Sequence, residues 1–193
     1  MEVIEQSRAR RLRGATDDMH QRLDSRINAA DAFGSIGQYG RFVQMQWVFH
    51  AEIAPLYADP LLQDLLPGLP RRQKLELIAA DLTDLGLAPV MEPDLRFRRG
   101  AIDTAAALGW LYVAEGSNMG AALLRKQAAR LGLGDGHGAR HLAPAGEGPA
   151  AHWRDFTASL DAVPFDHAAE RRCEAGARQA FERVEHLAVL HLG

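Results

Sequence analysis

The chain has 193 residues, of which 47% are hydrophobic and 24% are charged, and its formal net charge is -3 at pH 7. This composition is typical of a globular domain and gives no general affinity for nucleic acid or membrane surfaces, and no apolar run reaches the roughly 18 residues of a transmembrane helix. The single cysteine, Cys173, excludes a disulfide framework, and the N-terminal segment lacks the apolar stretch of a secretory signal, so a cytoplasmic location is expected.

Helical periodicity extends over most of the chain. Apolar residues recur at three- and four-residue steps along residues 12–27 and 42–57. Further helices are expected near residues 70–85, 101–131, 149–160 and 165–190. Alternating runs of β-branched residues are nearly absent, so the sequence predicts an all-α fold with a single domain over residues 1–193.

A loop rich in glycine and proline is predicted at residues 132–149. Its alternating glycines resemble a phosphate-binding loop. However, the loop follows a helix rather than a strand, and it lacks the Gly-Lys-Ser/Thr ending of such loops. Phosphate binding is therefore the weaker interpretation.

Eight histidines raise the question of a metal site. The chain lacks the paired Glu-x-x-His motifs that mark a di-iron helical bundle. His137 and His141 lie in the glycine-rich loop and are expected to be surface residues. His20 and His50 lie on apolar helix faces, where each is either a core histidine or, as in haem proteins, an iron ligand.

His20 shares a helix face with Arg13, seven residues earlier. At 100° per residue the two side chains are two turns apart, roughly 10 Å along the axis. That separation suits a haem with its iron under the histidine and its propionates at the arginine. The spacing alone favours the alternative, a solvated arginine in the basic stretch "SRARRLR".

A row of small side chains follows Tyr112 in the predicted helix "GWLYVAEGSNMGAALL". Gly116 and Gly120 come four and eight residues after Tyr112, so all three lie on one face, with the ends of the row about 12 Å apart. Each glycine costs roughly 1 kcal/mol relative to alanine in a helix interior. Either a flat ligand lies against this backbone, with Tyr112 bonded to an acidic group at its edge, or another helix packs closely there.

Four segments together resemble bacterial haem oxygenases. They are "RLRGATDDMHQRLD", "YGRFVQMQWVFHAEIAPLY", "LGWLYVAEGSNMGAALL" and "GARHLA", and they occur in the order found in that family. The resemblance extends over roughly residues 8–145. It implies a single all-α domain with haem held between a proximal and a distal helix.

The resemblance also implies roles for individual residues. His20 matches the proximal iron ligand, and Arg13 and Tyr112 match positions that contact the propionates. Gly116, Ser117, Asn118 and Gly120 match the distal helix segment that is catalytic in the family. Animal members carry an aspartate further along this helix that organises water. Residues 116–131 contain no aspartate, which matches the bacterial branch and leaves the proton-delivery groups unassigned.

The reaction implied is oxidative cleavage of haem, which is both substrate and cofactor, to biliverdin, carbon monoxide and ferrous iron. It uses O2 and electrons from an external reductase, ferredoxin or flavodoxin. An acidic donor would dock on Arg8, Arg10 and Arg11, unless these residues are simply a solvated face. The sequence leaves open whether the purpose is iron acquisition or biliverdin supply to a bacteriophytochrome.

Two other classes of function remain at this point. One is a haem-binding or haem-delivery protein on the same fold that does not degrade its ligand. The other is an unrelated helical interaction domain in which His20 is merely buried. The intact pair of Gly116 and Gly120 favours turnover over storage.

Overall fold

The computed structural model describes residues 7–90, 97 and 101–193. The described residues form these helices: α1 (Arg8–Ala29), α2 (Ile36–Tyr57), α3 (Pro60–Leu65), η1 (Leu69–Arg72), α4 (Leu75–Asp84), α5 (Thr104–Arg130), η2 (Arg140–Leu142), α6 (Pro149–Ala162) and α7 (His167–Leu192). No strand forms among them, which confirms the predicted all-α class. None of these helices is long and apolar enough to cross a membrane.

The five longest helices begin where the sequence supplies a capping side chain or a proline. Ser7, Ser35, Asp103 and Asp166 each accept a hydrogen bond from a backbone N–H in the first turn, and Pro149 opens α6. These caps satisfy N–H groups that have no partner inside the helix. The short helix α3, capped by Asp59 and opened by Pro60, was not predicted by the periodicity.

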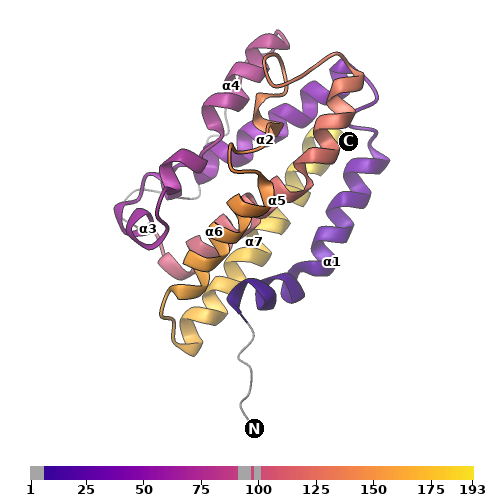
Figure 1. The fold of residues 1–193 in the computed structure, drawn as a ribbon. Helices are drawn as coiled ribbons and strands as arrows, with labels where there is room; N and C mark the ends of the chain where they lie inside the picture. Colours follow the sequence, from indigo (N-terminus) through magenta and orange to yellow (C-terminus); the bar gives the residue numbers. More distant parts are fainter. Residues whose placement is uncertain (1–6, 91–96, 98–100) are drawn as a thin grey trace.

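The two long helices α5 and α7 lie side by side through the middle of the molecule (Figure 1). Their backbones touch where two glycines meet the opposite helix. A Cβ atom on Gly109 would lie 2.0 Å from the carbonyl oxygen of Cys173, and one on Gly176 would lie 2.2 Å from that of Ala106. Both distances are shorter than any real contact, so only glycine permits this approach.

Helix α1 packs against α7 and α6, and its first residue is anchored between them. The buried Arg8 guanidinium donates to the Glu170 carboxylate at 2.7 Å and to the carbonyl oxygen of Val163 at 2.8 Å. Arg11 pairs with the same carboxylate at 2.8 Å. Arg8 is therefore 5% exposed and bonded within the fold. The basic surface expected from Arg8, Arg10 and Arg11 is smaller than predicted, because Arg8 does not contribute to it.

Helix α4 holds the glycine-rich loop through two carboxylates. Asp84 accepts from the backbone N–H of Gly138 at 2.8 Å, and Asp81 accepts from the backbone N–H groups of Arg140 and His141 at 2.9 and 3.0 Å. These N–H groups are engaged by protein carboxylates, which agrees with the rejection of a phosphate loop.

The expectation that His141 is a surface residue is wrong. His141 is 4% exposed, and its Nδ1 lies 2.7 Å from Asp81. The carboxylate comes from a helix sixty residues away in the sequence, which explains why the loop composition gave no sign of burial. His137 is exposed, as predicted.

Candidate functional site

The glycines of α5 have two different surroundings. Gly109 meets the backbone of α7, as described above. In contrast, a Cβ atom on Gly116 would make an ordinary contact with the Trp153 ring at 3.6 Å, and one on Gly120 would have no described neighbour within 4 Å. Close helix packing therefore explains Gly109 but does not explain Gly116 and Gly120, which leave one face of the α5 backbone open.

Large apolar side chains are exposed on the same face of α5. Met119 and Leu123 lie within about 60° of Gly116 around the helix axis, and they are 48% and 63% exposed. Exposed methionine and leucine beside bare backbone leave apolar surface in water. This combination suits a flat apolar ligand that would cover both side chains.

His20 on α1 presents an accessible imidazole. Its side chain is 61% exposed, and its Nδ1 lies 3.2 Å from the Asp24 carboxylate one turn later. The ring also makes an edge contact with Phe181 of α7, with the centroids 6.0 Å apart. The exposed imidazole can be reached by an external ligand, and a carboxylate near one ring nitrogen is a common feature of metal-binding histidines.

The exposure of His20 removes the interpretation of this residue as a core histidine. His50 is the buried one, at 6% exposure. Burial, together with the neighbouring charge of Lys74, lowers the pKa of His50 to about 3, and its Nδ1 has no hydrogen-bond partner among the described residues. Of these two candidates, His20 is the one that an external ligand can reach.

Arg13 of α1 and Tyr112 of α5 are electrostatic neighbours. Burial raises the pKa of Tyr112, and the positive charge of Arg13 opposes part of that rise. Tyr112 therefore stays protonated near neutral pH and can donate a hydrogen bond. This electrostatic interaction places α1, which carries His20, near α5, which carries the glycine row.

Ser117 and Asn118 are placed differently relative to the glycine row. Ser117 is exposed and lies about 60° around the axis from Gly120, at the margin of the glycine face, and its hydroxyl donates to the carbonyl oxygen of Ala114 at 2.7 Å. Asn118 lies about 200° around the axis from Gly116 and lines a cavity on the other side of α5. The catalytic role of both residues remains a prediction, and Asn118 is placed away from a ligand on the glycine face.

Sequence reasoning missed a buried polar group directly before Gly116. The Glu115 carboxylate, 2% exposed, accepts from the Tyr57 hydroxyl at 2.9 Å and from Arg72 at 3.0 Å. His152 of α6 lies 3.5 Å from it. The only signal was a glutamate inside an apolar helical stretch, and its partners come from three other segments of the chain.

Trp153 of α6 was also missed. Its ring packs against Tyr112, with the centroids 5.5 Å apart, and covers the Cβ position of Gly116. The adjacent His152 contacts Glu115. His152 and Trp153 therefore connect α6 to the part of α5 that contains Gly116.

These residues fit haem as a ligand. A single imidazole suits an iron whose other positions are filled by porphyrin nitrogens. The described residues contain no group of three or more histidine, cysteine, aspartate or glutamate side chains that could bind a bare metal ion. The glycine row and exposed apolar side chains suit the macrocycle, and Arg13 and Tyr112 suit its carboxylates.

The described residues form an all-α protein in which α1 and α5 carry the candidate ligand-binding residues. Residues 95–188 match the family model described as Heme oxygenase. The chain is 43% identical over 176 residues to Heme oxygenase PigA of Pseudomonas aeruginosa, and the match covers 91% of this chain and 88% of that protein. The chain belongs to the haem oxygenase family, which confirms the resemblance drawn from its motifs.

Solved structures give the same family. The NO- and CO-bound haem oxygenase of Neisseria meningitidis matches with a TM-score of 0.91 and 36% identity, over 97% of this chain and 92% of that one. The haem oxygenase of Leptospira interrogans matches with a TM-score of 0.74, over 95% of this chain and 98% of that one. At 18% identity, this second likeness concerns the fold alone.

Proposed function

We propose that this protein is a haem oxygenase that cleaves haem to biliverdin, carbon monoxide and ferrous iron, with O2 and electrons supplied from outside. Membership of the family supports this activity. The observation that carries it is the open Gly116 and Gly120 row on α5, paired with the accessible His20 on α1, whose Nδ1 lies 3.2 Å from the Asp24 carboxylate. Haem is the substrate, and it supplies the iron at which oxygen is activated.

His20 binds the iron through Nε2 in this proposal. A hydrogen bond from Nδ1–H to the Asp24 carboxylate, 3.2 Å away, would favour the tautomer that has a free lone pair at Nε2. A neutral imidazole donates less electron density than the thiolate that promotes O–O cleavage in other haem enzymes. His20 therefore suits a reaction in which the macrocycle itself is oxidised.

Gly116 and Gly120 form the distal wall. Without side chains, the backbone of α5 can lie directly over the macrocycle and restrict the direction in which oxygen approaches it. Trp153 limits this opening next to Gly116, because its ring lies 3.6 Å from the Cβ position of that glycine. Ordered water beside the polar Ser117 would carry protons to the site.

Arg13 and Tyr112 hold the propionates. A cation–carboxylate contact at a partly open edge contributes on the order of 1 kcal/mol. That is too little to decide whether haem binds, but it is enough to select one of several rotated orientations of a nearly symmetric macrocycle. The orientation determines which meso carbon faces the distal wall.

An external electron donor completes the proposed reaction. It is a reductase, ferredoxin or flavodoxin, and the exposed Arg10 on α1 is a basic residue at this helix end that an acidic donor can reach. We place the reaction in the cytoplasm. The biliverdin either reaches a bacteriophytochrome or is the by-product of iron release.

Turnover of the haem complex tests the proposal. The purified protein is titrated with hemin and then given a reductant in the presence of oxygen. Loss of the Soret band with formation of biliverdin is the expected result. A stoichiometric complex whose Soret band persists would instead make the protein a haem carrier, and failure to form a complex would contradict both functions.

A further inference from the structure

A cavity of about 490 Å³ lies on the side of α5 away from the glycine row. Its walls come from α5, the segment between η1 and α4, the chain around η2, and the start of α6. The α5 residues that line it are Asn118, Ala121, Ala122 and Arg125. At about 30 Å³ per water molecule, this volume corresponds to roughly sixteen waters, enough for a small organic molecule.

Basic side chains are the main charged groups of this lining, whose other residues are mostly apolar. Five basic side chains face this cavity, and Asp135 is the single carboxylate of the lining; the five are Arg71, Arg72, Lys74, Arg125 and Arg140. The amides of Gln73 and Asn118 add neutral hydrogen-bond donors. We propose that this cavity is a binding site for a small multivalent oxyanion, such as a di- or tricarboxylate or a phosphate ester.

Three of the five cations already have carboxylate partners. Arg72 pairs with Glu115 at 3.0 Å, Arg125 pairs with Asp135, and Arg140 pairs with Asp84. These pairs orient the guanidinium groups and offset part of their charge. The Arg72 pair is buried, whereas the Arg125 pair lies at the surface, with its side chains 45% and 43% exposed.

Lys74 and Arg71 supply the charge that remains unbalanced. The Lys74 Nζ donates to the carbonyl oxygen of His141 at 2.6 Å, and it has no carboxylate partner among the described residues. Arg71 is exposed and likewise has no carboxylate partner within the described part of the chain. An ammonium bonded only to a neutral carbonyl gains most from an oxyanion next to it.

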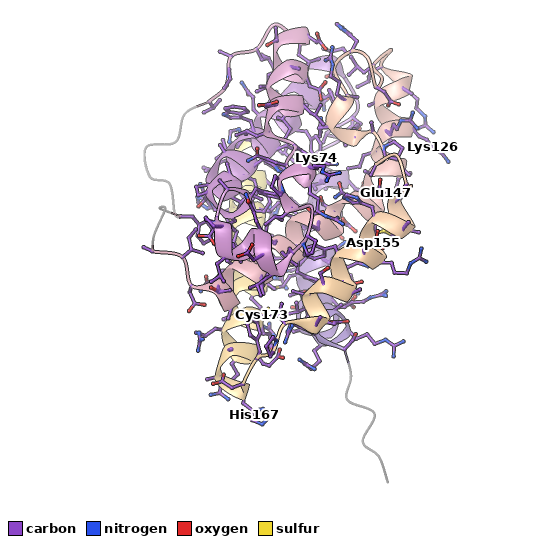
Figure 2. All side chains as sticks on the ribbon, turned by 60° about the vertical axis from the view of Figure 1, so that its left-hand side comes forward. Lys74, Lys126, Glu147, Asp155, His167 and Cys173 are labelled. Carbon is purple, nitrogen blue, oxygen red and sulfur yellow. The ribbon has the colours of Figure 1, made fainter. Side chains whose placement is uncertain are left out.

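Burial of Lys74 strengthens this argument. Lys74 is partly buried, whereas Lys126 of α5 is exposed; both are labelled in Figure 2. Burial lowers the pKa of Lys74 to about 8, and the negative charge of Glu115 only partly offsets that effect. Of the other nearby titratable groups, His50 and His141 have pKa values lowered by burial and remain neutral at that pH, whereas contacts with Glu115 and Glu147 raise the pKa of His152, which also lines the cavity.

The site is separate from the proposed haem site, and its ligand does not depend on haem chemistry. Both sites use α5, but they lie on opposite faces, since Asn118 and Arg125 are about 160–180° around the axis from Gly116. Arg72 connects them, because it lines the cavity and also binds Glu115, the residue before Gly116.

Calorimetric titration of the full-length, haem-free protein tests the proposal. Citrate and inorganic phosphate are the probes, in a low-salt buffer without other multivalent anions. We expect saturable binding of at least one probe with a stoichiometry of one, and the tighter probe distinguishes a carboxylate ligand from a phosphate ligand. Absence of binding by both probes would overturn the proposal.

Two variants and one control connect binding to the cavity. Arg71→Ala and Lys74→Met should each weaken binding about tenfold, the effect of losing one charge-assisted hydrogen bond. Arg41→Ala removes an exposed arginine of α2 outside the cavity and should leave the affinity unchanged. Equal weakening in all three variants would indicate non-specific attraction to basic surface and would contradict the site. Arg71 is exposed, so its variant remains informative even where Lys74→Met folds poorly.

Proton uptake gives a second, independent measurement. At about pH 8 Lys74 is partly deprotonated, and an oxyanion bound beside it raises its pKa, so binding should take up protons from the buffer. Titrations in two buffers with different ionisation enthalpies measure that uptake. Lys74→Met should abolish it while His137→Gln, a histidine outside the cavity lining, retains it, and uptake that persists without Lys74 would assign the site to other groups.

Discussion

Glu115 and Arg72 form a buried ion pair directly before the first open glycine of α5. The Arg72 Nη1 lies 3.0 Å from Oε2 of Glu115, and the side chains are 10% and 2% exposed. The Tyr57 hydroxyl donates to the other carboxylate oxygen. The pair therefore joins α5, η1 and α2 at the edge of the proposed haem site.

Removing one partner of this pair should destabilise the fold strongly. Glu115→Leu leaves the Arg72 charge buried without a partner, which costs about 3–5 kcal/mol in the free energy of unfolding. Urea denaturation measures the loss. The matched control is Glu185→Leu, which breaks the more exposed pair with Arg22 and should cost about 1 kcal/mol or less. Equal losses in the two variants would show that Glu115 has no special structural role.

Replacement of His20 should remove the protein ligand of iron without unfolding the chain. The side chain is 61% exposed, so His20→Ala deletes little buried surface. Electron paramagnetic resonance of the ferric complex should lose the histidine nitrogen signal and regain one on addition of imidazole. His137→Ala, which removes another exposed histidine, is the control. A histidine signal that survives in His20→Ala would transfer the assignment to His50.

Valine substitutions should separate the two kinds of glycine in α5. Gly109→Val forces side-chain atoms into the α7 backbone and should lower the melting temperature of the haem-free protein sharply. Gly120→Val has free space and should leave that melting temperature nearly unchanged or slightly raised. In single-turnover assays, however, Gly120→Val should form less biliverdin per folded molecule. Normal turnover combined with a large loss of stability in Gly120→Val would restore the packing explanation.

The product should be α-biliverdin, because a basic residue at position 13 resembles relatives that cleave at the α carbon. Arg13→Ala should then give a mixture of isomers, since a contact of about 1 kcal/mol corresponds to roughly a fivefold preference. Chromatography of the products measures both results. A wild-type product that is mainly the β or δ isomer would contradict the proposed orientation.

The contribution of His152 to stability should depend on pH. Contacts with Glu115 and Glu147 raise its pKa above that of an unfolded histidine, so its stabilising effect is complete below about pH 6.5 and disappears as the pH rises through the raised value. His152→Gln should therefore be less stable than wild type at acidic pH, with the difference shrinking in alkaline solution. Urea denaturation at several pH values checks this. A difference that grows with pH would mean that burial outweighs the carboxylates.

Local sequence signals predicted most of the helices. Apolar periodicity located α5 and α7, although α5 is buried on all sides over residues 107–115 and on fewer positions beyond them. The spacing of the glycine row marked it as unusual within one helix, whereas the role of His20 came from the resemblance to haem oxygenases and remains a prediction. Such features depend on residues a few positions apart, which is the range that a sequence pattern describes.

Contacts between distant segments could not be predicted in the same way. The burial of His141 depends on Asp81, and the burial of Arg8 depends on Glu170, more than 150 residues away. The Glu115 group draws on three other segments. In each case the sequence contains an ordinary polar residue, and only tertiary structure supplies the partner that makes its burial favourable.

The position of the glycines along α5 determines which part of this helix can adapt. One end is fixed where Gly109 touches α7, and the other is fixed near Ala128, which is fully buried. Gly116 and Gly120 lie between these supports, with little or nothing packed against them. Helix α5 is thus packed against the core at both ends and largely uncovered in its middle. The middle can therefore bend over a ligand whose shape changes from intact ring to opened product, while the packed ends stay in place.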